Sequence, residues 1–254
     1  MAFFFPAVWI VASSFKQEAD VYTSPPRWLF HPTLAQYRLV LSTGGVTPAL
    51  MHSVEAAVGS TLLVIVLATP AAFALSLFAI KRWKDALFFV ISTKFAPPVA
   101  VIVPIFIIAR DIGALDKVWL LVVVYTAMNL PIGIWMLRSF IAEIPREVVE
   151  AASVDGGGLL RSLWYIVLPM ALPGLFATAV ICLVFAWNDF FFSLNLTATQ
   201  AVTVPVYVQS FVASEGLYFA KFSAAALIGA VPVVVLGWSA QKRLVRAFTF
   251  GAIK

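Results

Sequence analysis

Four polar side chains lie inside long apolar segments of this chain: Lys94, Asn129, Asn188 and Asp189. A charged or amide group at membrane depth is costly, so such residues usually serve a function there. An ammonium, two amides and a carboxylate together offer hydrogen-bond donors and acceptors to a hydroxylated solute. We therefore predict that these four residues line a polar path for a solute through a membrane.

Packing offers a second interpretation of each residue. Lys94 could snorkel or pair with a carboxylate, Asn129 could cap a proline kink, and Asn188 could bond an adjacent helix. Beside Asn188, Trp187 and the phenylalanines at 190–192 fit either the C–H surface of a sugar or an interfacial aromatic belt. Both interpretations stay open from the residues alone.

No enzyme motif accompanies these residues. The chain lacks a Gly-x-x-x-x-Gly-Lys-[Ser/Thr] phosphate loop, so the energy for any active transport must come from a partner. It also lacks the His-Glu-x-x-His and Gly-x-Ser-x-Gly motifs of hydrolases. With two isolated histidines and a single cysteine, Cys182, no metal site or disulfide framework is expected. We predict a transport subunit without enzymatic activity or cofactor.

A second motif lies in a polar loop between two long apolar segments and reads Glu150-Ala-Ala-Ser-Val-Asp-Gly156. Pro145 suits a helix start, and Glu147 and Glu150 place carboxylates near the positive end of the helix dipole. Glycines at 156–158 then end the helix, since glycine adopts positive φ without strain. The pattern predicts a short helix on a glycine hinge, with Ala151 and Ala152 giving it a smooth face for a partner.

The spacing of this loop resembles that of ABC-importer permeases: Glu-Ala-Ala, three residues, Gly156, nine residues, and then Ile166-Val-Leu-Pro169. Its surroundings are similar to the maltose-permease-like branch of carbohydrate importers, and the similarity covers most of the chain from about Ser53 onward. The segments that carry it are Arg138-Ser-Phe140, Ile144-Pro145, Ala186-Trp-Asn188 and Phe250-Gly-Ala252. Asp189 departs from the Glu that is common at this position in the family.

This resemblance implies a multi-pass permease of the bacterial cytoplasmic (inner) membrane. Its loop helix would dock in a cleft of a separate ATP-binding subunit through Glu150, Ala151, Ala152, Asp155 and Gly156. Two homologous permease subunits, here a heterodimer, would enclose the path, two ATP-binding subunits would drive it, and an extracytoplasmic binding protein would deliver the solute. The implied solute is a sugar or a sugar alcohol.

The sugar alcohol rests on a narrower likeness to the mannitol- and sorbitol-type branch of these permeases. The segments that carry this likeness are 188–197, 214–218, 220–224 and 244–254. The segment 202–218 is the outer loop expected to meet the binding protein, so its likeness is equally explained by that partner. Amides and a carboxylate beside aromatic rings would suit a linear polyol, a hexose or a disaccharide.

Composition supports a membrane protein independently of any motif. Hydrophobic residues make up 62% of the chain and charged residues only 11%, and the mean hydropathy is +0.99. The 254 residues allow about six helices of ~20 residues, the length that crosses a lipid bilayer. The net charge of +5 comes from basic residues that flank apolar segments, so it indicates topology rather than a nucleic-acid partner.

We expect one all-α transmembrane domain over residues 1–254, with an extracytoplasmic loop at 16–52 and a cytoplasmic coupling loop at 140–169. Basic residues concentrate on the side of the coupling loop, which places that loop in the cytoplasm. The segment 3–15 would span only about 20 Å as a helix, so we expect its start to lie upstream, with a secretory signal as the alternative. The expected helices are approximately 1–15, 53–80, 86–109, 118–137, 170–192 and 222–239.

Two other classes of function remain in view. A self-sufficient secondary transporter could couple a small polar solute to protons or sodium through Lys94 and Asp189, but the sequence shows no internal repeat of the kind such transporters have. A structural membrane anchor would not need a spaced cytoplasmic motif.

Overall fold

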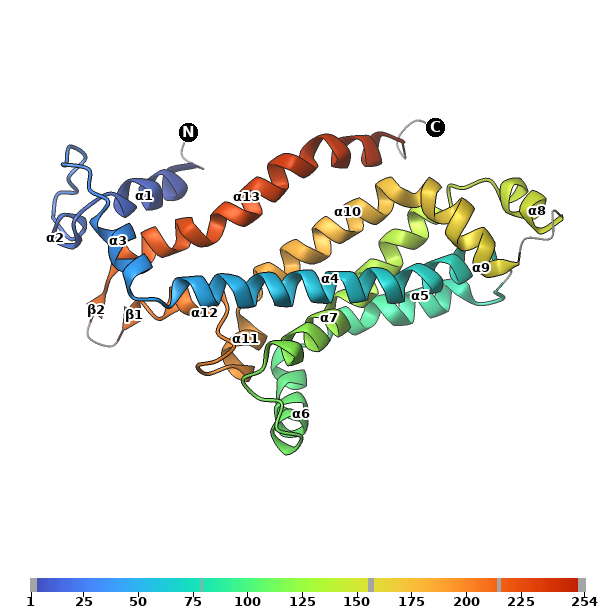
Figure 1. The fold of residues 1–254 in the computed structure, drawn as a ribbon, viewed down its shortest axis with the longest axis horizontal. Helices are drawn as coiled ribbons and strands as arrows, with labels where there is room; N and C mark the ends of the chain where they lie inside the picture. Colours follow the sequence, from blue (N-terminus) through green and yellow to red (C-terminus); the bar gives the residue numbers. More distant parts are fainter. Residues whose placement is uncertain (1–3, 79, 155–157, 214–215, 251–254) are drawn as a thin grey trace.

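The computed structural model describes residues 4–78, 80–154, 158–213 and 216–250. It is an elongated helical bundle, in which the longest helices run along one common direction (Figure 1). These helices are α4 (Val46–Leu77), α7 (Val118–Ile141), α10 (Leu168–Trp187) and α13 (Phe219–Phe250). The strands β1 (Val212–Ala213) and β2 (Gly216–Leu217) form one short antiparallel pair, so the predicted all-α class is confirmed.

Among the described residues, four helical segments are long and apolar enough to cross a membrane, by length and composition: Val46–Leu77, Val118–Ile141, Leu159–Trp187 and Phe219–Ser239. A bent pair made of Trp83–Phe95 and Pro98–Asp111 qualifies as a fifth if it is counted as one span. Helix α1 (Phe5–Ser14) has 10 residues, which is shorter than a span, as the sequence indicates. The described residues therefore hold four or five such spans, and the expected number of six transmembrane helices stays a prediction.

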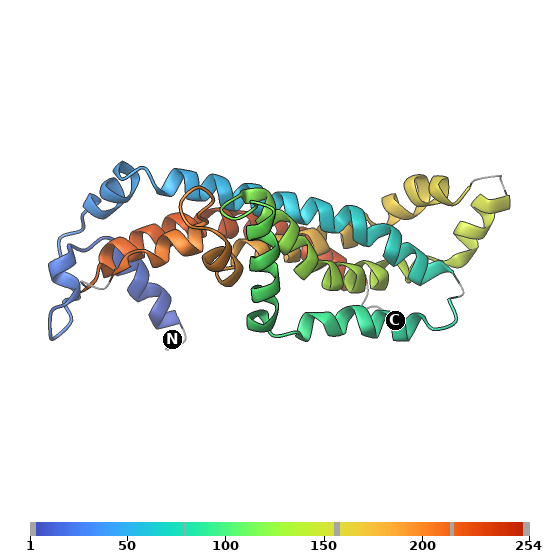
Figure 2. The same cartoon turned by 90° about the horizontal axis from the view of Figure 1, so that it is seen from below.

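The predicted helix at 86–109 differs from the structure, because its two halves meet at 84°. Helix α5 (Trp83–Ser92) continues into a 3-10 turn, η2 (Thr93–Phe95), and α6 (Pro98–Asp111) then leaves nearly at a right angle (Figure 2). A residue before proline avoids the helical region, and both Ala96 and Pro97 have extended ψ angles, of 128° and 124°. The two consecutive prolines thus break the span.

Small residues let α4 lie close along α7. Ala56, Ala57 and Ala68 on α4 are fully buried, and a Cβ added at Gly133 of α7 would collide with the side chain of Val64. Lipid chains are as apolar as the helix surfaces, so the hydrophobic effect contributes little to helix association within a membrane. Close van der Waals packing of this kind stabilises such bundles instead. Helix α10 packs on both α4 and α7, and α13 packs on α10.

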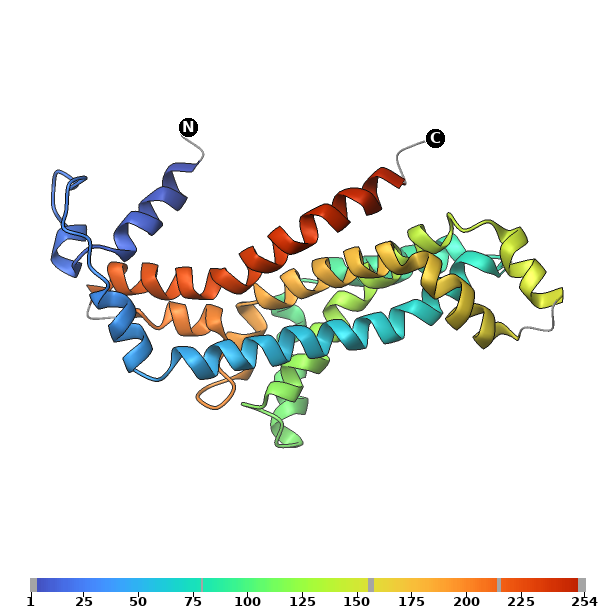
Figure 3. The same cartoon turned by 45° about the horizontal axis from the view of Figure 1, so that its top comes forward.

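At one end of the bundle, α1 and two further short helices, α2 (Glu18–Val21) and α3 (Ala35–Ser42), cover the start of α13 (Figure 3). The Glu18 carboxylate accepts a hydrogen bond from the backbone N–H of Ala220 at 3.0 Å, so it caps the N-terminus of α13. Lys16 is buried, donates to the carbonyl of Arg27 at 2.8 Å, and lies 4.4 Å from the ring centroid of Trp9. We call this the hairpin end, because β1 and β2 lie there.

A single carboxylate joins two loops near the middle of the molecule. Asp116 lies between α6 and α7 with a φ of 60°, and its side-chain oxygens accept hydrogen bonds from the backbone N–H groups of residues 198–201. Those residues connect α11 (Phe191–Leu196) to α12 (Val204–Gln209). Burial by itself would raise the pKa of Asp116, but the four N–H donors outweigh it and hold this pKa well below its usual value.

At the opposite end, α8 (Arg146–Val154) projects beyond the bundle (Figure 1). Beyond it, the chain returns through α9 (Leu159–Ser162) and a π-helical turn, η3 (Leu163–Val167), into α10. The N–H of Leu168 bonds the carbonyl of Leu163, five residues back. Pro169 has no N–H to give to the carbonyl of Tyr165, so the wider π spacing arises where the ordinary helical bond is impossible. We call this the α8 end.

Candidate solute path and coupling helix

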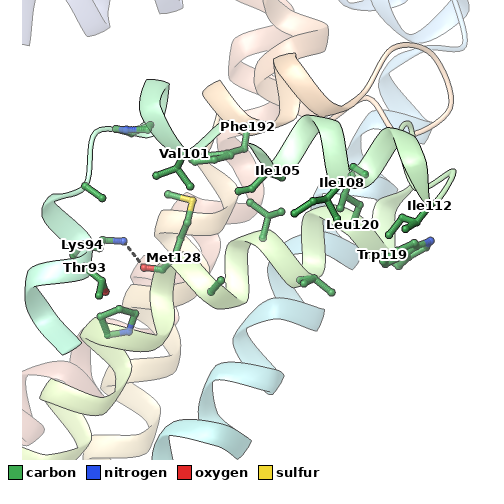
Figure 4. Close-up of a pocket in the computed structure, with 17 residues that line it drawn as sticks. Thr93, Lys94, Val101, Ile105, Ile108, Ile112, Trp119, Leu120, Met128 and Phe192 are labelled. Atoms are coloured by element: carbon green, nitrogen blue, oxygen red, sulfur yellow. Dashed lines mark hydrogen bonds between the residues drawn. The ribbon is translucent and has the colours of Figure 1, made fainter. Parts of the chain in front are cut away.

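Lys94 lies on η2, at the break between α5 and α6, and fastens that break to α7. Its ammonium Nζ donates to the backbone carbonyl of Met128 at 2.9 Å, drawn as a dashed line in Figure 4, and to Oδ1 of Asn129 at 3.3 Å. Pro131 stands inside α7, and an interior proline loosens the preceding turn and frees its carbonyls for neighbouring donors. Lys94 is such a donor, so its hydrogen bond connects the break between α5 and α6 to the proline-containing turn of α7.

Asn129 extends this contact toward α10. Its side chain is buried, and its amide Nδ2 lies 3.5 Å from the carbonyl of Cys182, at the long limit of a hydrogen bond. The Lys94 ammonium also lies 5.4 Å from the ring centroid of Phe185 on α10. Two of the four predicted path residues thus form one polar contact between η2, α7 and α10.

Asp189 follows α10 and caps the next helix. Its Oδ1 accepts from the backbone N–H groups of Phe192 at 3.1 Å and Ser193 at 3.3 Å, at the start of α11. The charges of Lys94 and Asp189 interact electrostatically, but the two side chains form no ion pair among the residues that the structure describes. Asp189 therefore has a structural task and also contributes negative charge near the Lys94 contact.

Tyr125 belongs to the same region, although the sequence reasoning did not select it. Its hydroxyl is buried and approaches Asp189 and Ser193 without reaching hydrogen-bond geometry. Residues four apart share a helix face, so Tyr125 and Asn129 point the same way from α7. The four-residue spacing of these two polar side chains was the sequence signal that could have identified Tyr125.

Asn188 lies elsewhere. Its amide donates to the carbonyl of Val184 at 2.8 Å on its own helix, and it faces a cavity of about 450 Å³ between α10, α12 and α13. Trp187, Phe190 and Gln209 also line this cavity. The structure therefore separates Asn188, Trp187 and Phe190 from the Lys94 contact, whereas Phe192 lines the groove that contains Lys94.

An apolar groove of about 590 Å³ runs between α6 and α7, with Lys94 at one end (Figure 4). Its walls are almost entirely aliphatic and aromatic, including Ile105, Ile108, Trp119 and Met128. A hydroxylated solute would find the Lys94 ammonium at one end of this groove and the indole N–H of Trp119 at the other.

Helix α8 occupies the predicted coupling loop. It starts directly after Pro145, and Glu150 and Ala151 are exposed on it. Ile144, just before it, is buried against Leu163 and Val167 of the returning chain, which anchors the base of the loop. Of the other predicted docking residues, Ala152 lies within α8, and Asp155 and Gly156 lie outside the described residues.

These features define a polytopic membrane protein whose bundle carries a polar contact at membrane depth and an exposed helix beyond one end. Residues 64–247 match the family described as "Binding-protein-dependent transport system inner membrane component", and the chain belongs to that family. It is accordingly a multi-pass protein of the cytoplasmic membrane and a transport subunit rather than an enzyme.

Three relatives match nearly the whole chain. The "Probable ABC transporter permease protein y4oR" of Sinorhizobium fredii is 32% identical, over 99% of this chain and 91% of its own. The "Sulfoquinovosyl glycerol transport system permease protein SmoH" of Agrobacterium fabrum is 34% identical, over 98% and 88%. The "Trehalose/maltose transport system permease protein MalG" of Thermococcus litoralis is 30% identical, over 98% and 91%.

Solved structures support the fold. A chain of a bacterial ABC transporter involved in the import of the acidic polysaccharide alginate superposes with a TM-score of 0.78 at 23% identity, covering 95% of this chain and 90% of that one. A chain of the MetNI methionine ABC transporter superposes with a TM-score of 0.65 at 16% identity, covering 82% and 98%.

Proposed function

We propose that this chain is the permease subunit of an ATP-driven carbohydrate importer and that α8 couples it to a separate ATP-binding subunit. The observation that carries the coupling role is the placement of α8. It projects beyond the α8 end of the bundle with Glu150 and Ala151 exposed, and it is linked through η3 to a membrane span. Movement of this helix would therefore be passed toward α10 through α9 and η3.

The carbohydrate class is supported by the relatives, whose names specify a sulfoquinovosyl glycerol system and a trehalose/maltose system. By the same family relation, the partners are a homologous permease subunit, a pair of ATP-binding subunits and an extracytoplasmic binding protein. Lys94, Asn129 and Asp189 are the proposed polar groups of the path, with Tyr125 beside them. Within the described residues Lys94 is held by a carbonyl and Asp189 by a helix cap, so no specific observation favours an ion-coupled secondary transporter.

The finer proposal is a sugar alcohol, which rests on the likeness of segments 188–197, 214–218, 220–224 and 244–254 to the mannitol- and sorbitol-type branch. We test it by uptake of labelled mannitol, sorbitol, glucose, maltose and trehalose in a strain that lacks the chain and is complemented by it. Polyol uptake that depends on the chain supports the proposal. Dependence of the disaccharides alone contradicts the polyol and leaves the carbohydrate class standing.

The coupling role is tested with Glu150→Lys, which reverses an exposed charge on α8, and with Gly156→Val. Both variants should insert normally but lose uptake or lose the ATP-binding subunit on purification. Glu143→Lys is the matched control, because Glu143 is an exposed carboxylate of the same loop outside α8. Full transport by both coupling variants would refute the role of α8.

A further inference from the structure

Two cations approach the ring of Trp83 at the start of α5. The guanidinium carbon of Arg138, in the last turn of α7, lies 3.7 Å from the ring centroid, and Nζ of Lys84 lies 5.6 Å from it. Lys81 and Arg82 precede Trp83 directly and are exposed. We call Lys84, Trp83 and Arg138 the Trp83 cluster.

The cluster has an excess of positive charge without a carboxylate partner. The ion pairs among the described residues are Arg27–Asp20 and Arg110–Asp111, and neither belongs to it. Asp85 is exposed in the first turn of α5 and joins no ion pair in the same set of residues. The Nε of Arg138 is buried and has no hydrogen-bond partner.

A buried donor without an acceptor is costly, and a guanidinium offers several donors in one plane that match the oxygens of a phosphate. The first N–H groups of α5 add a weak positive field, because its N-cap, Arg82, makes no side-chain capping bond. An anion with several oxygen acceptors would balance the charges of Lys84 and Arg138, for which the described residues supply no ion-pair partner.

The side chains that follow the cluster along α5 indicate which kind of molecule carries this anion. Residues four apart share a helix face, so Phe88 lies on the same face as Lys84, one turn further from the N-terminus of α5. Phe88 and its neighbour Phe89 are 73% and 70% exposed. A charged end followed by exposed rings matches an amphiphile, whereas free phosphate would use the cations alone.

We propose that the Trp83 cluster binds the phosphate of an anionic phospholipid of the cytoplasmic leaflet, with its acyl chains along the Phe88 face of α5. Clusters of basic residues at a membrane end attract anionic lipids in this way. Arg138 lies at the base of the loop that carries α8, so the bound lipid also steadies the root of the coupling helix. This consequence rests on the proposed function, while the binding itself does not.

The test uses the assembled transporter complex in nanodiscs with equal amounts of phosphatidylcholine and phosphatidylglycerol. After release into detergent, native mass spectrometry counts the lipids that stay bound. Phosphatidylglycerol should be retained over phosphatidylcholine by wild type. Lys84→Gln should weaken this preference about fivefold, the effect of one basic residue near an anionic surface, and the double variant Lys84→Gln/Arg138→Gln should abolish it.

Lys84→Gln keeps the Arg138–Trp83 stack, so it reports binding even if loss of Arg138 disturbs folding. Arg161→Gln is the matched control, an exposed basic residue on α9 of the same end, and it should retain the preference. Glu150→Lys should also retain it, which separates this proposal from the coupling role.

Three results would overturn the proposal. The first is an equal loss of preference in Arg161→Gln, which would indicate general surface charge. The second is displacement of phosphatidylglycerol by millimolar inorganic phosphate, which would indicate a free-anion site. The third is efficient cross-linking of a photoreactive residue at position 83 to a partner subunit, which would indicate a protein interface.

Discussion

Replacement of Asp116 by asparagine should destabilise the protein more than its single charge suggests. The carboxylate accepts hydrogen bonds from the N–H groups of Ala198, Thr199, Gln200 and Ala201 at 2.9 to 3.2 Å, and from the Thr199 hydroxyl at 3.1 Å. Asparagine keeps the size and tolerates the positive φ, but it turns one acceptor oxygen into an NH₂ donor that faces other donors.

The magnitude follows from the exposure of the site. A hydrogen bond to a charged group contributes about 1.5–3 kcal/mol, but water can reach most of these donors after the change, so the losses do not add. We expect about 2–3 kcal/mol in total, which for a chain of this length lowers the melting temperature by about 4–12 °C. Asp111→Asn is the control, because its ion pair with Arg110 is exposed and contributes at most about 1 kcal/mol.

Cys182 supplies the assay, since it is the single cysteine of the sequence and is fully buried. A dye that fluoresces on reaction with thiols reports its exposure as the protein is heated. Because the folded pKa of Asp116 lies below its unfolded value near 3.8, its contribution is fully present above that value and is lost as the pH falls below it. The difference between wild type and Asp116→Asn should be constant from pH 6 to 8. A shift under 1 °C, or an equal shift in Asp111→Asn, would refute this reasoning.

Three further predictions concern the path, the packing and the topology. Lys94→Met should lower uptake at least tenfold while Lys94→Arg keeps part of it, measured with the transported sugar; equal uptake by both would remove Lys94 from the path. Gly133→Val should reduce the yield of folded protein because the added methyl groups collide with Val64, and Val64→Ala on the same chain should restore part of it; no rescue would contradict this contact. In a cysteine-free background, a cysteine at Lys84 should resist an impermeant maleimide outside intact cells, whereas one at Lys117 should react; the reverse pattern would invert the topology.

The membrane class and the short helix α8 could be predicted because each depends on local signals. A run of apolar residues indicates a span, and Pro145 with the following carboxylates indicates the start of α8. The two consecutive prolines, Pro97 and Pro98, are also a local signal for a bend. The direction in which α6 leaves that bend, however, is set by packing. The predicted continuous helix there did not account for it.

The grouping of the candidate path residues could not be predicted, because it depends on contacts between distant parts of the chain. Lys94 reaches the Met128 carbonyl and Oδ1 of Asn129 from η2, where the span breaks, 34 and 35 residues earlier in the chain. Asn188 and Asp189 are neighbours in sequence, yet the end of α10 directs them to different surroundings. Asp116 gave no signal at all, since its partners lie more than 80 residues away.

The π turn at η3 makes the orientation of α9 relative to α10 depend on the exact number of residues in the turn. A π turn holds one residue more than an α-helix needs, and one residue of helix corresponds to a rotation of about 100° and a rise of about 1.5 Å. Deleting one residue from Leu163–Val167 would leave the span intact but rotate α9 relative to α10. The exposed side chains of α9, Arg161 among them, would then face a different direction at the α8 end.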